Sequence, residues 1–209
     1  MTIDDANRAE LAARLRNYGP PISARVMDEM WQDPFWEKRF GERGRARANE
    51  DAAFHIQYLA ESVETSDGDV MKRYAYWLQT LLTTRGMSTR HLDDNFARLA
   101  DALARDLPGS EIAVDHLASA RSALHHPEGP ARDLQAACDR ISSREEIRYV
   151  IAHLADAIAL NRPDVFAAHA KWLRDVGHGD RLTEALAAVE NATSLSEATK
   201  LAARTTAAT

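Results

Sequence analysis

The stretch that decides the fold occurs twice: residues 50–78 read EDAAFHIQYLAESVETSDGDVMKRYAYWL, and residues 145–173 read EEIRYVIAHLADAIALNRPDVFAAHAKWL. Aligned without gaps, at a spacing of 95 positions, these segments share nine identical residues: Glu50/Glu145, Ile56/Ile151, Leu59/Leu154, Ala60/Ala155, Asp69/Asp164, Val70/Val165, Ala75/Ala170, Trp77/Trp172 and Leu78/Leu173. Alanine-rich amphipathic helices match to some degree by composition alone. Tryptophan is rare, however, with 4 in the chain, and one pair is in register. The alignment therefore predicts an internal duplication.

The match resumes after a five-residue deletion, with Leu92/Leu182, Phe96/Leu186 and Leu99/Val189. We therefore expect residues 49–104 and 144–192 to form equivalent three-helix units. Matching positions should share a role. In each unit the matched aspartate, Asp69 or Asp164, is expected to cap a helix, and the matched tryptophan, Trp77 or Trp172, to anchor its core.

Apolar residues recur at helical spacing along the chain, and no segment alternates long enough to predict a strand. The pattern predicts an all-α bundle of about eight helices in one domain. Breakers are expected at Gly19-Pro20-Pro21 and at Pro127-Glu128-Gly129-Pro130, which is the best candidate for a boundary between halves. The segment 43–47 reads as a polar stretch. Residues 193–209, rich in alanine, threonine and serine, are expected to be a frayed tail.

Composition narrows the class of protein. The net charge of −6 argues against general affinity for nucleic acid, because phosphate binding needs a concentrated positive face. The polar, acidic first residues do not resemble a signal peptide, and no apolar run approaches a membrane span. A single cysteine, Cys138, cannot form an intramolecular disulfide. We therefore expect a cytoplasmic protein that contacts neither membrane nor nucleic acid.

Signatures of common enzymes and metal proteins are absent from the sequence: there is no glycine-rich phosphate loop, no His-Glu-x-x-His, no Cys-x-x-Cys and no Glu-x-x-His. The adjacent pair His125-His126 is expected to be solvated rather than to bind metal. His153 and Asp156 are three positions apart on one helix and read as a structural pair. Cys138 reads as a packed small side chain.

One basic island, residues 38–47, lies in this acidic chain and follows the aromatic residues Trp31, Phe35 and Trp36. Arginines pair with carboxylates and aromatic faces hold planar groups, so the island could hold a flat anionic ligand. The alternative is a solvated loop beside core aromatics. His55 lies at the edge of an apolar stripe, where it could bind a ligand or be a half-buried boundary residue. The candidate ligand-binding residues are Trp36, Arg43, Arg47, His55, Tyr58 and Trp77.

The series Leu59, Asp67-Gly68-Asp69-Val70, Trp77-Leu78, Arg85-Gly86-Met87-Ser88 and Phe96 resembles the later helices of phycobiliprotein-related globin-like proteins, in particular bilin-biosynthesis-associated globins. The resemblance covers a quarter to a third of the chain. It implies a globin-like bundle and a non-covalent bilin or heme as cofactor. The family attaches its chromophore to a cysteine shortly before this unit, and the first copy has none.

Three functions remain open from the sequence. The first is a non-catalytic helical binding or regulatory protein for a planar tetrapyrrole. The second is a protein-interaction or oligomerisation module, such as a homodimer, without a small ligand. The third is a helical enzyme whose catalytic residues converge only in the folded chain, although we expect no catalytic and no metal-binding residues.

Overall fold

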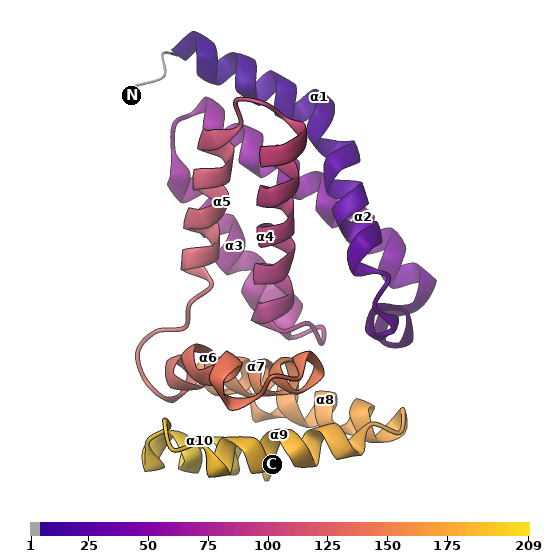
Figure 1. Cartoon of the computed structure of the whole chain (residues 1–209), viewed down its shortest axis with the longest axis vertical. Helices are drawn as coiled ribbons and strands as arrows, with labels where there is room; N and C mark the ends of the chain where they lie inside the picture. Colours follow the sequence, from indigo (N-terminus) through magenta and orange to yellow (C-terminus); the bar gives the residue numbers. More distant parts are fainter. Residues whose placement is uncertain (1–4) are drawn as a thin grey trace. The chain divides into compact units, whose positions relative to one another are not determined.

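The computed structural model describes residues 5–209, which form ten α-helices and no strand (Figure 1). The all-α class is confirmed, the expected eight helices are too few, and a globin-like arrangement stays a prediction. The helices are α1 (Asp5–Met30), α2 (Pro34–Glu64), α3 (Gly68–Thr83), α4 (Thr89–Asp106), α5 (Glu111–Ala123), α6 (Pro130–Ile141), α7 (Glu145–Ala159), α8 (Pro163–Asp175), α9 (Gly179–Asn191) and α10 (Glu197–Ala207). Within the described residues, no helix combines the length and apolarity that crossing a membrane requires.

The chain divides into two compact units. The first unit comprises residues 5–76 with Asp93–Ala123, and the second comprises Trp77–Leu92 with Leu124–Thr209. Helices α3 and α4 each contribute residues to both units. The expected boundary at 127–130 is displaced, because the chain passes into the second unit already at Leu124.

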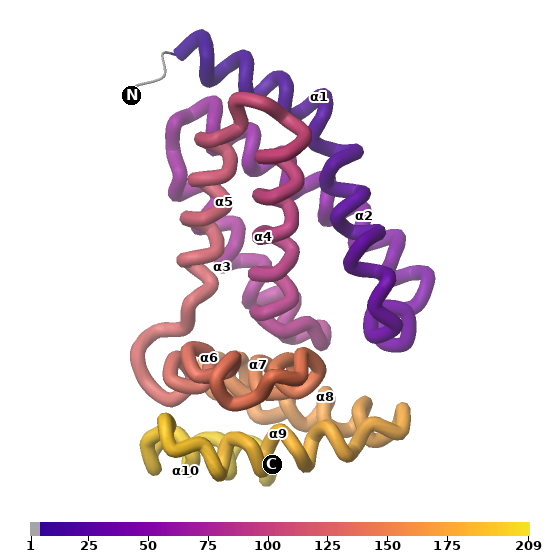
Figure 2. Tube along the Cα trace, viewed as in Figure 1, coloured from indigo at the N-terminus to yellow at the C-terminus, as the bar shows by residue number. Residues whose placement is uncertain are grey.

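Helix α1 runs through the expected break at Gly19-Pro20-Pro21, so the prediction of a helix end there is wrong. Proline removes one backbone donor but keeps a helical φ, and packing can compensate for the lost bond. Gly19 allows α1 to lie close against α2, since a Cβ at this position would come within 2.7 Å of Ile56 Cγ2. The Ser23 hydroxyl then donates to the Ala52 carbonyl oxygen at 2.9 Å. Figure 2 shows the two helices side by side.

Helix α2 begins at a cap that the sequence signals well: Asp33 accepts from the Phe35 backbone N–H, and Pro34 occupies the first turn. The expected polar stretch 43–47 is helical as well. Only Gly41, with φ 61° and ψ −170°, interrupts the helix, because glycine alone adopts this backbone conformation without strain. The segment 34–64 is therefore two helical pieces joined at a kink.

In the second unit, α7 is the central helix and packs against α6, α8, α9 and α10. Buried residues lie on nearly every face of α7, because other helices surround it, and its sequence is accordingly rich in apolar residues. The segment expected to be a frayed tail contains α10. Ser196 caps α10 by accepting from the Thr199 N–H, and the Thr199 hydroxyl donates to Asp133 Oδ2 at 2.7 Å. Leu195 and Ala203 are buried beside them.

The ends of α2 and α7 have the same geometry at matched positions. Each helix ends in a left-handed residue, Ser66 with φ 54° and Asn161 with φ 51°. These are the only non-glycine residues with positive φ in the described chain, and they lie 95 positions apart. The Asp67 N–H bonds the Ser62 carbonyl at 3.0 Å, and the Arg162 N–H bonds the Ala157 carbonyl at 2.9 Å. Both ends are therefore Schellman motifs in the register of the sequence match.

The next turns also correspond, after the expected deletion. Helix α3 has 16 residues and α8 has 13, and both close through glycines with positive φ, Gly86 and Gly177. Helices α4 and α9 then begin at Thr89 and Gly179. The two helix starts lie 90 positions apart, which is the spacing of 95 less the five-residue deletion of the sequence alignment. Superposition of 49–104 on 144–192 as whole units stays a prediction.

The cap role assigned from the duplication is wrong, and the anchor role is wrong for Trp77, whereas Trp172 is partly buried against the core of the second unit. Asp67, not Asp69, caps α3, since its Oδ1 accepts from the Asp69 N–H at 2.9 Å. Asp164 likewise lies inside the first turn of α8, where it pairs with Arg162. Trp77 is 55% exposed and is not a core anchor, because the neighbouring Leu78, at 2%, faces the interior instead.

Comparing two adjacent truncations tests this assignment. We expect Trp77→Ala to lower the free energy of unfolding by about 1 kcal/mol or less, as for other exposed positions. Leu78→Ala should cost about 2–5 kcal/mol, because it opens a cavity in the core. Urea denaturation of both variants measures the difference. A larger loss for Trp77→Ala than for Leu78→Ala would mean that the tryptophan is buried.

Candidate functional site

The six predicted ligand-binding residues belong to two different units. Five belong to the first unit, whereas Trp77 belongs to the second. Trp36 is buried in an aromatic cluster with Trp31, Phe35 and Phe40. Arg43 is exposed, and so is Arg47, which pairs with Glu50 at 3.3 Å. A pocket shared by these residues therefore stays a prediction.

Two of the predicted residues, His55 and Tyr58, contact the same side chain. His55 Nδ1 hydrogen-bonds the Tyr74 hydroxyl at 2.8 Å, and the Tyr58 ring stacks on the Tyr74 ring with 4.0 Å between centroids. Burial lowers the pKa of His55 to about 4, so this imidazole is neutral at physiological pH. Burial also raises the pKa of Tyr74 above its ordinary value. The sequence had placed His55 at a boundary, but the side chain is inside the core.

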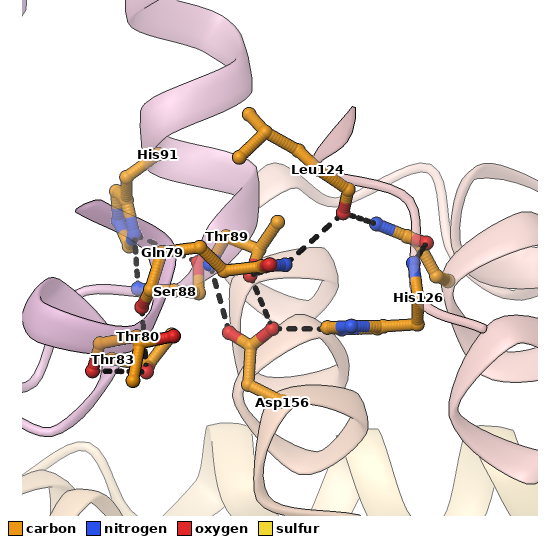
Figure 3. A network of polar contacts seen from close by, with 10 residues as sticks. Gln79, Thr80, Thr83, Ser88, Thr89, His91, Leu124, His126 and Asp156 are labelled. Atoms are coloured by element: carbon orange, nitrogen blue, oxygen red, sulfur yellow. Dashed lines mark hydrogen bonds and ion pairs between the residues drawn. The ribbon is translucent and has the colours of Figure 1, made fainter. Parts of the chain in front are cut away.

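The densest polar arrangement lies in the second unit, around the carboxylate of Asp156 on α7 (Figure 3). Asp156 is only 1% exposed. Its Oδ2 accepts from the Thr89 backbone N–H at 2.8 Å, and its Oδ1 accepts from the Thr89 hydroxyl at 2.5 Å. His126 Nε2 lies 2.9 Å from the same Oδ1. Three contacts thus compensate the lost hydration of a buried acid.

Side-chain amides extend this network outward from Thr89 and His126. Gln79 Nε2 donates to the Thr89 hydroxyl at 3.0 Å and to the Leu124 carbonyl at 3.1 Å. Gln135 Nε2 donates to the same carbonyl, and its Oε1 accepts from the His126 N–H at 2.9 Å. The network therefore fixes the loop at 124–126, and the prediction that His126 is solvated is wrong.

His91 caps the N-terminus of α4, where Thr89 contacts Asp156. Its Nδ1 accepts from the Ser88 backbone N–H at 3.0 Å and lies 2.8 Å from the Ser88 hydroxyl. This is the reciprocal half of a capping box, in which histidine takes the place of the usual glutamate or glutamine. Burial lowers the pKa of His91 to about 3. A neutral imidazole suits the contact, because Nδ1 must be unprotonated to accept.

Flat side chains stack beside this turn. The His91 ring lies on Tyr149 with 4.1 Å between centroids, and the Arg90 guanidinium lies 5.9 Å from the same ring. His153 stacks on His169 at 3.7 Å. The expected pairing of His153 with Asp156 is wrong, because Asp156 bonds Thr89 and His126 instead. The rings fill the space between helices as apolar surfaces.

The titratable groups at the centre of this network are buried, since Asp156 is 1% and His126 8% exposed. Cys138 donates to the Arg148 carbonyl, and burial raises the pKa of its thiol to about 11, as expected of a packed side chain. Among residues 5–209, no group of three or more His, Cys, Asp or Glu side chains is arranged to hold a metal ion. The geometry is that of a structural polar core.

The α7 face has a counterpart on α2. We define the α7 face as Tyr149, His153 and Asp156, and the α2 face as the matched residues, which are Phe54, Tyr58 and Glu61. The stacked pairs correspond as well, since Tyr58 on Tyr74 lies at the positions of His153 on His169. The segment 88–91 covers the α7 face. On the α2 face Phe54 is 49% and Tyr58 38% exposed, and Glu61 is exposed.

Sequence reasoning missed the role of Thr89 and found only part of this face. Asp156 was noted only as a structural partner of His153, and nothing in the sequence joins Thr89 to a residue 67 positions away. The exchange Glu61/Asp156 was available as a conservative pair in the alignment. Comparisons with protein-family models, curated proteins and solved structures found no match for this chain.

Removing one hydroxyl tests the Asp156 network. We expect Thr89→Val to lower the free energy of unfolding by about 1–3 kcal/mol, because a buried carboxylate oxygen loses a donor. Thr84→Val is the matched control, since Thr84 is exposed and its hydroxyl donates to the carbonyl of nearby Leu81, at the end of α3. Equal effects in guanidinium denaturation would show that the network adds no stability.

Acid should destabilise the protein through its buried histidines. An unfolded histidine binds a proton below a pKa of 6.5, whereas His55 and His91 stay neutral down to about 4 and about 3. The unfolded state therefore takes up protons first, and the free energy of unfolding should fall from pH 6.5 to about 4. Between its unfolded and folded pKa values, each histidine lowers the free energy of unfolding by about 1.4 kcal/mol for each unit by which the pH falls. His91→Gln keeps a capping-box acceptor and should remove one histidine's share of the slope. An unchanged slope would mean that His91 is charged in the folded state.

Proposed function

We propose that this chain is a non-catalytic protein-interaction module, and that the α2 face is its binding surface. The observation that carries this proposal is the contrast between matched faces: two aromatic side chains and a carboxylate are exposed on α2, whereas their counterparts on α7 are covered. Aromatic residues are enriched at the centres of protein interfaces, because they bury a large area at low entropic cost.

The alternative functions find less support in the geometry. An enzyme needs a reactive group that substrate can reach, and the most polar cluster is buried. A tetrapyrrole site needs cations beside a flat cavity, whereas Arg43 and Arg47 are exposed and His55 is bonded to Tyr74. A spectral shift of heme or biliverdin on titration, lost in an Arg43→Ala, Arg47→Ala variant, would favour the ligand-binding function over this proposal.

Photo-crosslinking at the α2 face tests the proposal directly. A benzophenone amino acid in place of Tyr58 should form a covalent adduct with one defined protein in cells, identified by mass spectrometry. The matched control is the same substitution at Tyr18 on α1, which is more exposed, at 59%, but has no covered counterpart. If position 58 gives no adduct beyond that of position 18, the α2 face is not a binding surface.

A further inference from the structure

The covered α7 face shows what kind of group fits such a surface. Its occupant is the N-terminus of helix α4. The first backbone N–H and the hydroxyl of Thr89 bond Asp156, and the ring of His91 lies on Tyr149. A carboxylate against free N–H groups at a helix N-terminus is favourable for both the hydrogen bond and the helix dipole. The α2 face offers the same order of groups, with Phe54 for Tyr149 and Glu61 for Asp156.

We infer that the α2 face binds the N-terminus of α9 of a second copy of this chain, in a head-to-tail contact. The inference rests on the proposed function and names its partner. Within one chain, the turn before α4 occupies the α7 face. Between chains, the corresponding turn before α9 occupies the α2 face of the next copy.

The turn before α9 is the counterpart of the turn before α4 by backbone geometry. The His91 N–H bonds the Ser88 carbonyl at 3.0 Å, and the Arg181 N–H bonds the His178 carbonyl at 3.1 Å. Both turns follow a left-handed glycine, and both lead directly into a helix. Arg181 therefore stands at the position of His91.

Charge complementarity favours this occupant. The cap residue of α9, His178, makes no side-chain hydrogen bond to the helix, so the first N–H groups of α9 can take an outside acceptor. Glu61 is exposed and can supply it. Arg181, in place of His91, suits the exposed ring of Phe54, because a guanidinium stacks on an aromatic face.

A head-to-tail contact uses two different surfaces, so it generates rings or open chains rather than a two-fold dimer. This property allows a test by complementation. Phe54→Glu removes the aromatic face and leaves the turn intact. Arg181→Glu reverses the charge of the turn and leaves the face intact. A mixture of the two variants retains one complete interface, between the face of one and the turn of the other.

Sedimentation velocity on the purified full chain measures the outcome. We expect the mass of the wild-type protein to rise with concentration, and each variant alone to remain a monomer. The equimolar mixture should give a species of twice the monomer mass and nothing larger. Tyr18→Glu, which changes an exposed aromatic residue on α1, should associate like wild type. Circular dichroism confirms that each variant is folded.

Substitution of the carboxylate supplies an independent arm. Glu61→Arg should abolish association, because it removes the acceptor and places a cation against the N–H groups of α9. This variant leaves Phe54 unchanged, so it does not depend on how Phe54→Glu affects the fold.

Two outcomes would overturn the inference. A wild-type chain that stays monomeric at every concentration has no self-contact of this kind. A wild-type dimer that survives Arg181→Glu but not Phe54→Glu joins two α2 faces instead. In either case a crosslink from position 58 to a different protein leaves the proposed function standing, whereas the absence of any crosslink removes both.

Discussion

A buried carboxylate is the constraint on which the second unit depends. An ionised acid that is 1% exposed must find donors inside the protein, or it would destabilise the fold by several kcal/mol. Asp156 finds them at the beginning of a helix, where backbone N–H groups have no partner of their own. The same contact therefore gives donors to the buried carboxylate and an acceptor to the first N–H group of the helix. The loop at 124–126 and the amide of Gln79 are held around it by further hydrogen bonds.

The histidines near this carboxylate act as neutral polar rings rather than as charges. His91 is buried, and accepting from Ser88 requires that its Nδ1 carry no proton. His153 and His169 stack where the matched positions hold Tyr58 and Tyr74. An aromatic ring of either kind maintains the contact between the two helices, so the exchange of tyrosine for histidine preserves packing. The sequence position of a histidine is thus a poor guide to metal or ligand binding in this chain.

Much of the fold follows from local signals, and the errors lie where tertiary contacts override them. Apolar periodicity predicts the helical class, and the two Schellman ends lie in the register of the predicted duplication. The run Gly19-Pro20-Pro21 reads as a helix end, yet close packing of Gly19 on Ile56 keeps α1 continuous. Trp77 reads as a core anchor because tryptophan is large and apolar. The helical phase that buries Leu78 nevertheless turns Trp77 outward. The candidate site was beyond prediction for the same reason, since Thr89 and Asp156 meet only in the folded chain.

Because the same face occurs twice in the chain, its exposed copy on α2 can be compared with its covered copy on α7. A single exposed aromatic residue is ordinary on a protein surface and needs no explanation. Phe54 and Tyr58 differ from that case, because the chain contains the same face a second time with its occupant in place. The α7 face shows that two rings and a carboxylate at this spacing can receive the start of a helix. On α2 the carboxylate is the longer glutamate, so a matching helix N-terminus can stand slightly farther from the backbone and still be bonded. The two faces therefore differ in the length of the carboxylate and in the kind of ring beside it, and both keep two rings and one acid at the same spacing.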